Sequence, residues 1–206
     1  MSHAVNGRRK PDGRSVGRVS RQDWIDAARR ALIKGGVDAI KVDRLARDMK
    51  ITRGSFYWHF NARQDLLDAV LSDWSERAIE PFADIVQSHY GAPRHQFERL
   101  LGLFSGGGGL DPALEAAVRG WARIDQTAAE QLIKADEARI AVLDHVLSAL
   151  GFAKPDAHAR ARIVYFHQIG ASLSGSVQPA QRTVAELMEI LIGTERSPAE
   201  RLAQYG

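Results

Sequence analysis

The sequence predicts an all-α protein with a small basic head and a larger helical body. Apolar residues recur at helical spacing along most of the chain, and no stretch shows the period of two that marks a half-buried strand. Glycine and proline clusters separate these helical stretches. The charge is uneven: residues 1–60 hold 14 Lys/Arg and 6 Asp/Glu, a net of +8, whereas the other 146 hold 14 and 19, a net of −5.

Length and composition exclude several classes of protein. The 206 residues suffice for one large or two small domains with a real core. There is no cysteine, which excludes a disulfide framework, a thiol nucleophile and cysteine-based metal sites. No apolar run reaches the roughly 18–20 residues of a membrane span, and the basic amino terminus lacks the apolar core of a secretory signal. We therefore expect a cytoplasmic protein with no cofactor, no metal and no membrane partner.

The head is predicted to begin with a flexible basic arm at residues 1–19, which are rich in Gly, Arg and Ser. Ser20 then suits the N-cap of a first helix, and Asp23 places a carboxylate in its first turn. Gly35-Gly36 ends this helix. The apolar residues at helical spacing in between are Trp24, Ile25, Ala28, Ala31 and Leu32.

A second short helix is predicted around Val42–Met49, and a third begins at Arg53 with Thr52 as its cap. The third helix lies in ITRGSFYWHF, residues 51–60, which places four aromatic rings within five positions. A helix that only packs against a core needs rings on one stripe, not all round. We expect the rings of Phe56 and Phe60, four residues apart, to pack on the first two helices. Arg53, Tyr57 and Trp58 then face outward.

Three short helices in about 45 residues, with a tight link before the third, are typical of a helix-turn-helix DNA-binding domain, here at residues 20–66. In that motif the third helix enters the major groove. Arg53 can pair with guanine, and rings can rest on thymine methyl groups. Gly54 permits close approach of the backbone, and Ser55 can donate a hydrogen bond to a phosphate or a base.

The stretch VDRLARDMKITRGSFYWHFNARQDLLDAV, residues 42–70, resembles the DNA-binding head of the TetR family of bacterial transcriptional regulators. The similarity covers about residues 20–75 and rests on the Phe-Tyr-x-His-Phe core, the basic residue after it and the Leu-Leu pair. It implies contacts with bases or the groove from Arg53, Gly54, Ser55, Tyr57 and Trp58, and contacts with phosphates from Thr52, His59 and Arg63.

Two residues depart from the family pattern. Lys50 stands where the turn usually has glycine, so a non-glycine is expected at positive φ, at a cost of about 1 kcal/mol. Lys41 stands where the second helix usually opens on Thr or Ser, which loses a cap worth about 1 kcal/mol. Both changes add positive charge at the DNA face, and Lys41 joins the candidate DNA-binding residues.

The rest of the chain, residues 67–206, is predicted to be a helical effector-binding and dimerisation domain. Glu80-Pro81, Gly91–Pro93, residues 105–112, Gly151 with Pro155, and Gln178-Pro179 separate its helices. The last three helices are expected at 125–150, 156–175 and 183–193. The SGGGG run at 105–109 lacks the Lys of a phosphate-binding loop and is expected to be a flexible connection.

The resemblance also implies a pocket for an unknown small-molecule effector among the middle helices. Each candidate residue has ordinary helix packing as its alternative role, and Trp121 and His167 are favoured because amphipathic groups lie there within apolar stretches. The candidates are Phe104, Trp121, Arg123, Tyr165, Phe166, His167 and Gln168.

Residues 156–192 form two apolar-striped helices, which either close the monomer core or pair in a two-fold homodimer. A patch of small residues would allow close approach of helices: Gly170, Ala171, Ser172, Ser174 and Gly175. A dimer would also read a palindromic operator in double-stranded DNA, whereas one recognition helix reads few bases.

We therefore expect a transcriptional repressor released by a small molecule, with an activator or a ligand-independent DNA-binding protein of the same fold as alternatives. An all-α enzyme is poorly supported, because no Glu-x-x-His or HExxH pair occurs and GASLSGS at 170–176 fails the GxSxG pattern. A non-specific DNA-coating protein would need more positive charge than the acidic body offers.

Overall fold

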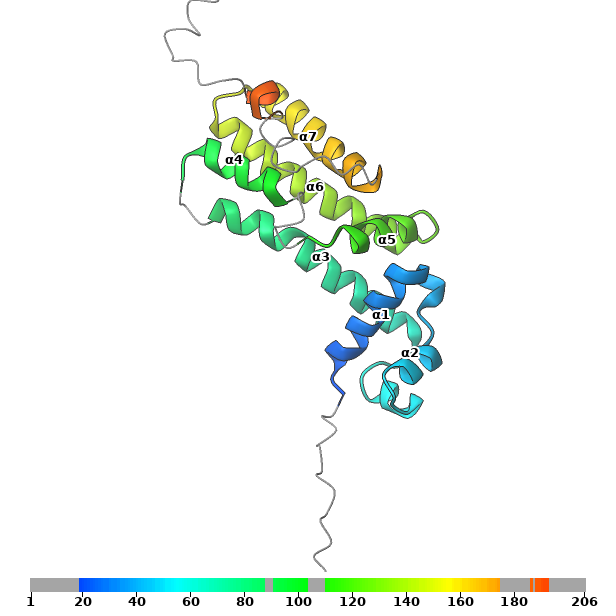
Figure 1. The fold of residues 1–206 in the computed structure, drawn as a ribbon. Helices are drawn as coiled ribbons and strands as arrows, with labels where there is room; N and C mark the ends of the chain where they lie inside the picture. The colour runs from blue at the N-terminus through cyan, green and yellow to red at the C-terminus, as the bar shows by residue number, and fades with distance from the viewer. Residues whose placement is uncertain (1–18, 88–90, 104–109, 175–185, 187, 193–206) are drawn as a thin grey trace, which may run out of the picture.

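The computed structural model describes residues 19–87, 91–103, 110–174, 186 and 188–192. These residues form helices joined by turns, and none of them lies in a strand, which confirms the all-α prediction. Figure 1 shows the helices before residue 59 as a head at one end of the long helix α3 (Arg63–Gln87), and the later helices as a body along the rest of it. No helix in the described part is both long and apolar enough to cross a membrane.

The first helix, α1 (Arg21–Gly35), begins and ends where local rules place its ends. The Ser20 hydroxyl accepts a hydrogen bond from the Asp23 N–H at 3.2 Å, and the Asp23 carboxylate accepts one from the Ser20 N–H at 2.7 Å. Hydrogen bonds from Ser20 hold the pKa of Asp23 below its ordinary value. Gly36 ends the helix with φ 72°, and its N–H donates to the Leu32 carbonyl.

A short 3₁₀ helix, η1 (Val37–Ala39), leads to α2 (Val42–Asp48). Lys41 precedes α2 without any side-chain cap, as its identity predicts. Lys50, in the turn after α2, has φ 58° and is the one non-glycine residue with positive φ in the described chain. The positive φ expected for this non-glycine residue is therefore confirmed.

The third helix of the head, η2 (Arg53–Trp58), is a 3₁₀ helix that ends two residues before Phe60. Its tight winding shows in the bonds from Ser55 N–H to Thr52 O, at 3.1 Å, and from His59 N–H to Phe56 O, at 2.9 Å. Gly54 and the consecutive aromatic residues have low α-helix propensity, which explains the winding. Thr52 is its N-cap by position, but its side chain makes no capping bond.

Helix α3 (Arg63–Gln87) runs without interruption from the head into the body, so the predicted break at Glu80-Pro81 is wrong. Buried side chains at Ala78, Phe82 and Ile85 hold the helix against the body on both sides of Pro81. Proline removes one backbone donor and displaces the preceding turn, which weakens the helix locally. Burial of this apolar face outweighs that cost. The domain boundary expected after residue 66 lies inside α3.

The body contains α4 (Pro93–Gly102), α5 (Pro112–Ala122), α6 (Gln126–Ala149) and α7 (Lys154–Ser174). Asp111 and Asp125 cap α5 and α6 through their side chains. Helix α6 lies in the middle of the body and packs against α3, α4, α5 and α7. Of the helix expected at 183–193, the described residues 186 and 188–192 are helical; the glycine run at 105–109 lies outside the described residues.

Two clusters of buried apolar residues form the core. One belongs to the body alone, and the other begins in the head around Trp24 and Phe56 and continues into Val118 and Trp121 of α5. The head is thus packed directly on the body as well as joined to it by α3. A shift of α5 or α6 would therefore disturb the packing of the head residues that share this core.

Candidate nucleic-acid interface and ligand pocket

The recognition segment η2 is held to the head by buried rings, as the sequence predicts. Phe56 and Phe60 are both buried and stack with ring centroids 5.4 Å apart. Trp24 of α1 meets Phe56 edge-on at 5.2 Å. Aromatic pairs in these arrangements contribute about 0.5–1.5 kcal/mol beyond the area they bury. The buried rings therefore anchor η2 to the rest of the head, and its opposite side is exposed and accessible to another molecule.

The outward side of η2 carries Arg53, Tyr57 and Trp58. Trp58 is 81% exposed and Tyr57 is 53% exposed, which is unusual for large rings on a small domain. Arg53 Nη2 donates to the Tyr57 hydroxyl at 3.0 Å, and Arg53 Nη1 lies 3.3 Å from Asp43 Oδ1. The Tyr57 bond and the Asp43 charge raise the pKa of Arg53, so it stays charged. This surface presents a guanidinium that is held by Tyr57 and Asp43, together with two exposed rings.

Gly54 is exposed at the start of η2, and the protein itself does not require a glycine there. A Cβ added to Gly54 would meet no heavy atom nearer than Thr52 Oγ1, at 3.8 Å. Its backbone also has no positive φ. Close approach by an outside molecule remains the physical use of the missing side chain. Thr52, Lys41 and Lys50 are exposed around the same segment, and Ser55 is half-buried.

His59 and Arg63 make contacts within the protein. His59 Nε2 lies 2.9 Å from the Val19 carbonyl oxygen, so this nitrogen carries the proton that is donated. This hydrogen bond holds Val19, the last residue of the predicted arm, beside the end of η2. Arg63 Nε donates to Ile40 O at 2.7 Å, and its Nη2 donates to Val37 O at 2.8 Å. The phosphate contacts of both residues stay predictions, and that of Arg63 depends on the N–H groups that these two bonds do not use.

The body contains a buried polar network that the sequence analysis did not identify, except for Tyr165. Arg139 of α6 is fully buried. Its two terminal nitrogens donate to the Glu115 carboxylate at 2.7 and 3.0 Å, and its Nε donates to the Ala78 carbonyl at 2.9 Å. Trp74 Nε1 also donates to Glu115, at 2.9 Å. Helices α3, α5 and α6 are therefore joined at one ion pair.

A second ion pair lies beside the first. Arg119 of α5 binds the Asp136 carboxylate through both terminal nitrogens, at 2.7 and 3.0 Å. The Tyr165 hydroxyl donates to Asp136 at 2.6 Å and accepts from Arg119 and Arg139 at 3.1 Å each. Burial raises the pKa of Tyr165 to about 12, so it stays protonated. Although burial disfavours their charged forms, the hydrogen bonds and charges of Asp136 and Glu115 leave the pKa values of Arg119 and Arg139 raised.

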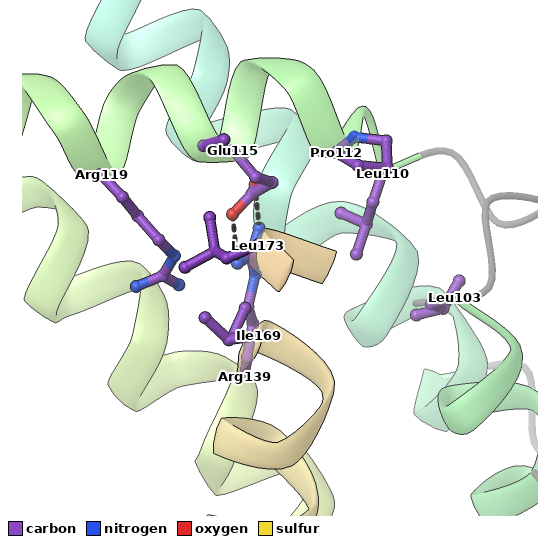
Figure 2. A pocket seen from close by; sticks show the side chains of 9 residues that line it. Leu103, Leu110, Pro112, Glu115, Arg119, Arg139, Ile169 and Leu173 are labelled. Atoms are coloured by element: carbon purple, nitrogen blue, oxygen red, sulfur yellow. Dashed lines mark hydrogen bonds and ion pairs between the residues drawn. The ribbon is translucent and has the colours of Figure 1, made fainter. Parts of the chain in front are cut away.

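Figure 2 shows a pocket between α5 and α7 that is lined by the Glu115–Arg139 pair and by Arg119 of the second pair. Its charged lining is Glu115, Arg119 and Arg139, and its apolar lining comes from α5, α7 and the ends of the connection before α5. Those apolar residues are Leu103, Leu110, Pro112, Ala116, Ile169 and Leu173. The pocket thus combines an apolar wall with a charged floor, the usual composition of a small-molecule site.

The seven residues that the sequence analysis proposed for a pocket are not brought together. Tyr165 lies in the polar network, Gln168 is buried, and Trp121 lies in the core shared by head and body. Three others are exposed: Arg123, Phe166 and His167. Phe104 lies outside the described residues. None of the six described candidates lines the pocket in Figure 2.

One signal in the sequence could have found Arg139. It stands four residues after Ala135 and four before Leu143, both of which are buried, so it falls on the buried stripe of α6. A charged residue on such a stripe requires a buried partner. Nothing in the sequence points to Glu115 as that partner.

A tight pair of helical segments, with its second member fixed by buried rings and exposed on its outer face, defines a helix-turn-helix protein. Residues 25–70 match the family model described as bacterial regulatory proteins, tetR family. Over 53 residues the chain is 43% identical to the HTH-type transcriptional regulator SrpR of Pseudomonas putida, covering 26% of this chain and 25% of SrpR. Over 57 residues it is 39% identical to the HTH-type transcriptional regulator TtgR of Pseudomonas putida, covering 28% of this chain and 27% of TtgR. These alignments span about a quarter of each relative.

Solved structures resemble the chain over most of its length. A transcriptional regulator from a Rhodococcus species superposes with a TM-score of 0.66 at 18% identity, covering 85% of this chain and 95% of that one. FadR of Bacillus subtilis, solved in complex with stearoyl-CoA, superposes with a TM-score of 0.62 at 14% identity, covering 85% and 100%. The amino-terminal domain thus matches the TetR family of bacterial regulatory proteins over residues 25–70, and the overall fold of the chain is that of these solved transcriptional regulators.

Proposed function

We propose that the chain is a sequence-specific DNA-binding repressor that acts in the cytoplasm as a homodimer and is released by a small molecule. The observation that carries this proposal is the outer face of η2, where Arg53 lies against the exposed ring of Tyr57 and the ring of Trp58 is also exposed. Water is a poor partner for such rings, whereas thymine methyl groups and guanine edges suit them and the guanidinium.

In this proposal η2 enters the major groove. Arg53, Tyr57 and Trp58 contact bases or the groove, and the exposed Gly54 lets the backbone approach closely, with Ser55 beside it. Thr52, His59, Arg63 and Lys41 contact the phosphate backbone and set the register of the head. Such contacts supply affinity for any duplex, whereas the face of η2 supplies the preference for one sequence.

A homodimer is supported by apolar residues on the outer side of α7. Ile163 is 60% exposed, and Phe166 is 47% exposed beside the small residues Gly170 and Ala171. Ile190, in the short helical stretch after α7, is 76% exposed. A self-complementary apolar face of this kind suits a two-fold interface, and two heads related by such an axis would read a palindrome.

Release by a small molecule is supported by the pocket of Figure 2 and by its link to α3. The Glu115–Arg139 pair forms part of the pocket floor and bonds to the Ala78 carbonyl of α3, which carries the head. One regulator with this fold was solved with stearoyl-CoA, so the fold has room for ligands. A ligand that favours an unsuitable spacing of the two heads would weaken operator binding, typically by about 1–3 kcal/mol.

The test is a selection of bound fragments from the source genome with the purified full-length protein, at low and at moderate salt. The proposal expects enrichment of one palindromic sequence that survives the added salt, because base contacts depend less on salt than phosphate contacts do. Fragments that share no sequence and all dissociate in moderate salt would instead identify a non-specific DNA-binding protein.

A further inference from the structure

The hydrogen bonds of the charged residues determine which polar group of a ligand the pocket in Figure 2 can bind. Both carboxylates are already well supplied with donors. Glu115 accepts three hydrogen bonds, one from Trp74 and two from Arg139. Asp136, behind Arg119, also accepts three, two from Arg119 and one from Tyr165. A ligand amine or ammonium group would therefore find carboxylates that are largely occupied.

The donors are less completely used. Arg119 lines the pocket, and its Nε is buried without a hydrogen-bond partner among the described residues. A buried N–H without a partner costs roughly 1–3 kcal/mol, so an acceptor placed against it is favoured. Arg139 contrasts with Arg119, because each of its three nitrogens donates to a carbonyl, a carboxylate or a hydroxyl.

The charge of the floor allows either a neutral or an anionic acceptor. Arg119 and Arg139 carry two positive charges, and Glu115 and Asp136 carry two negative charges, so the network is neutral as a whole. The raised pKa of both arginines and of Tyr165 keeps these groups in one protonation state near neutral pH. The unpaired N–H of Arg119, and not a net charge, is thus the feature that selects the polar end of a ligand.

The apolar walls select the rest of the ligand. Six of the nine described residues that line the pocket are apolar, and they include residues of α7 and of the start of α5. The cavity volume is about 20 Å³, which is room for about one water, so a larger ligand must displace a wall. Leu173, at the end of α7, is 54% exposed, so its displacement gives up little buried apolar area.

We infer that this pocket binds an apolar molecule tipped with an oxygen acceptor, a carboxylate or a carbonyl, and that the Nε–H of Arg119 recognises this oxygen. The inference rests on the proposed ligand-controlled function for its biological consequence. Its test measures binding directly and without DNA, so the two proposals can fail separately. If the probes bind but the fragment selection finds no operator, the regulatory role is contradicted and the binding site is still supported.

The experiment compares three probes that share one apolar body: 4-phenylbutyrate, its methyl ester and 4-phenylbutylamine. Calorimetric titration of the full-length protein should show the better of the two acceptor probes binding at least about tenfold more tightly than the amine. Tighter binding of the carboxylate than of the ester assigns an anionic ligand, and equal binding assigns a neutral acceptor. Failure of all three probes to bind, or binding of the amine as tight as that of the acceptors, overturns the inference.

Variants then locate the binding site. Arg119→Met should remove the preference for the acceptor probes, whereas Arg123→Met, an exposed arginine just after the same helix, should leave it unchanged. Ala116→Leu narrows the cavity without touching the ion pairs and should weaken binding of every probe. If Arg119→Met does not fold, the comparison of probes on the unmodified protein still decides the question. A preference that survives in a folded Arg119→Met protein contradicts the role of Arg119.

Discussion

At the scale of single residues, Lys50 introduces backbone strain into the turn between α2 and η2. Its φ of 58° lies in the left-handed region, where a side chain with a Cβ costs roughly 1–2 kcal/mol. Lys50→Gly should therefore raise the free energy of unfolding by about 1 kcal/mol, measured by urea denaturation. Lys50→Ala is the control, because it removes the charge and keeps the strain. Equal stability of the glycine and alanine variants would show that the turn is not strained.

Tyr165 predicts a specific dependence of stability on pH. Burial raises its pKa to about 12, whereas an unfolded tyrosine titrates near 10. Between these values the unfolded chain has lost the proton and the folded chain keeps it, so stability falls as pH rises through this window. The loss is roughly 2–3 kcal/mol in all. Denaturation curves from pH 9 to 11.5 should show this decline in the unmodified protein and a shallower one in Tyr165→Phe. Parallel declines would contradict the raised pKa.

The residues that could be predicted from the sequence are those governed by their near neighbours. The Ser20–Asp23 capping box and the positive φ of Lys50 follow from local rules. The burial of Phe56 and Phe60 follows from their spacing. The Glu115–Arg139 pair could not be predicted, because its partners are 24 positions apart and meet only when α5 packs on α6. The same reason explains why the six described candidates do not line the pocket of Figure 2.

At the scale of elements, α3 shows how tertiary contacts override a local signal. Pro81 predicts a break, yet the helix continues because its apolar side chains are buried before and after the proline. Arg139 adds a donor to the carbonyl of Ala78, three residues before Pro81, where a proline disturbs the helical hydrogen bonds. The segment η2 also differs from its local prediction. The sequence predicts a helix that begins at Arg53, but not that this helix is a 3₁₀ helix.

Replacement of Arg139 should be costly, because it leaves the Glu115 carboxylate buried without its cation. Arg139→Met is expected to lower the free energy of unfolding by roughly 3–5 kcal/mol, and adding Glu115→Leu should recover much of that loss. Urea denaturation measures both effects. Arg162→Met, an exposed arginine of α7, serves as the control and should change stability little. A single Arg139→Met variant as stable as the unmodified protein would remove this pair from the forces that hold α3.

At the scale of the whole molecule, one apolar core passes from the head into the body, and α3 runs through both. In the proposed function, a ligand in the body and a duplex at the head would influence each other through these packed side chains. The predicted basic arm, residues 1–19, adds positive charge to the head. His59 binds the carbonyl of Val19, so the arm begins beside η2.

Removal of residues 1–18 should weaken the salt dependence of DNA binding. This segment contains five cationic residues: Arg8, Arg9, Lys10, Arg14 and Arg18. If all five contact phosphates, the slope of log affinity against log salt becomes shallower by about 4. Removal of residues 1–7, which contain no Lys or Arg, is the matched control. An unchanged slope after the longer truncation would mean that the arm is only a solvated terminus.

The most direct test of the central claim, sequence-specific binding through η2, is a fluorescence anisotropy titration with two duplexes, the enriched palindrome and a scrambled duplex of the same composition. The unmodified protein should prefer the palindrome by at least about a thousandfold at physiological salt. Arg53→Ala should lose roughly 1–3 kcal/mol on the palindrome and little on the scrambled duplex. Equal affinity of the unmodified protein for both duplexes would contradict the account.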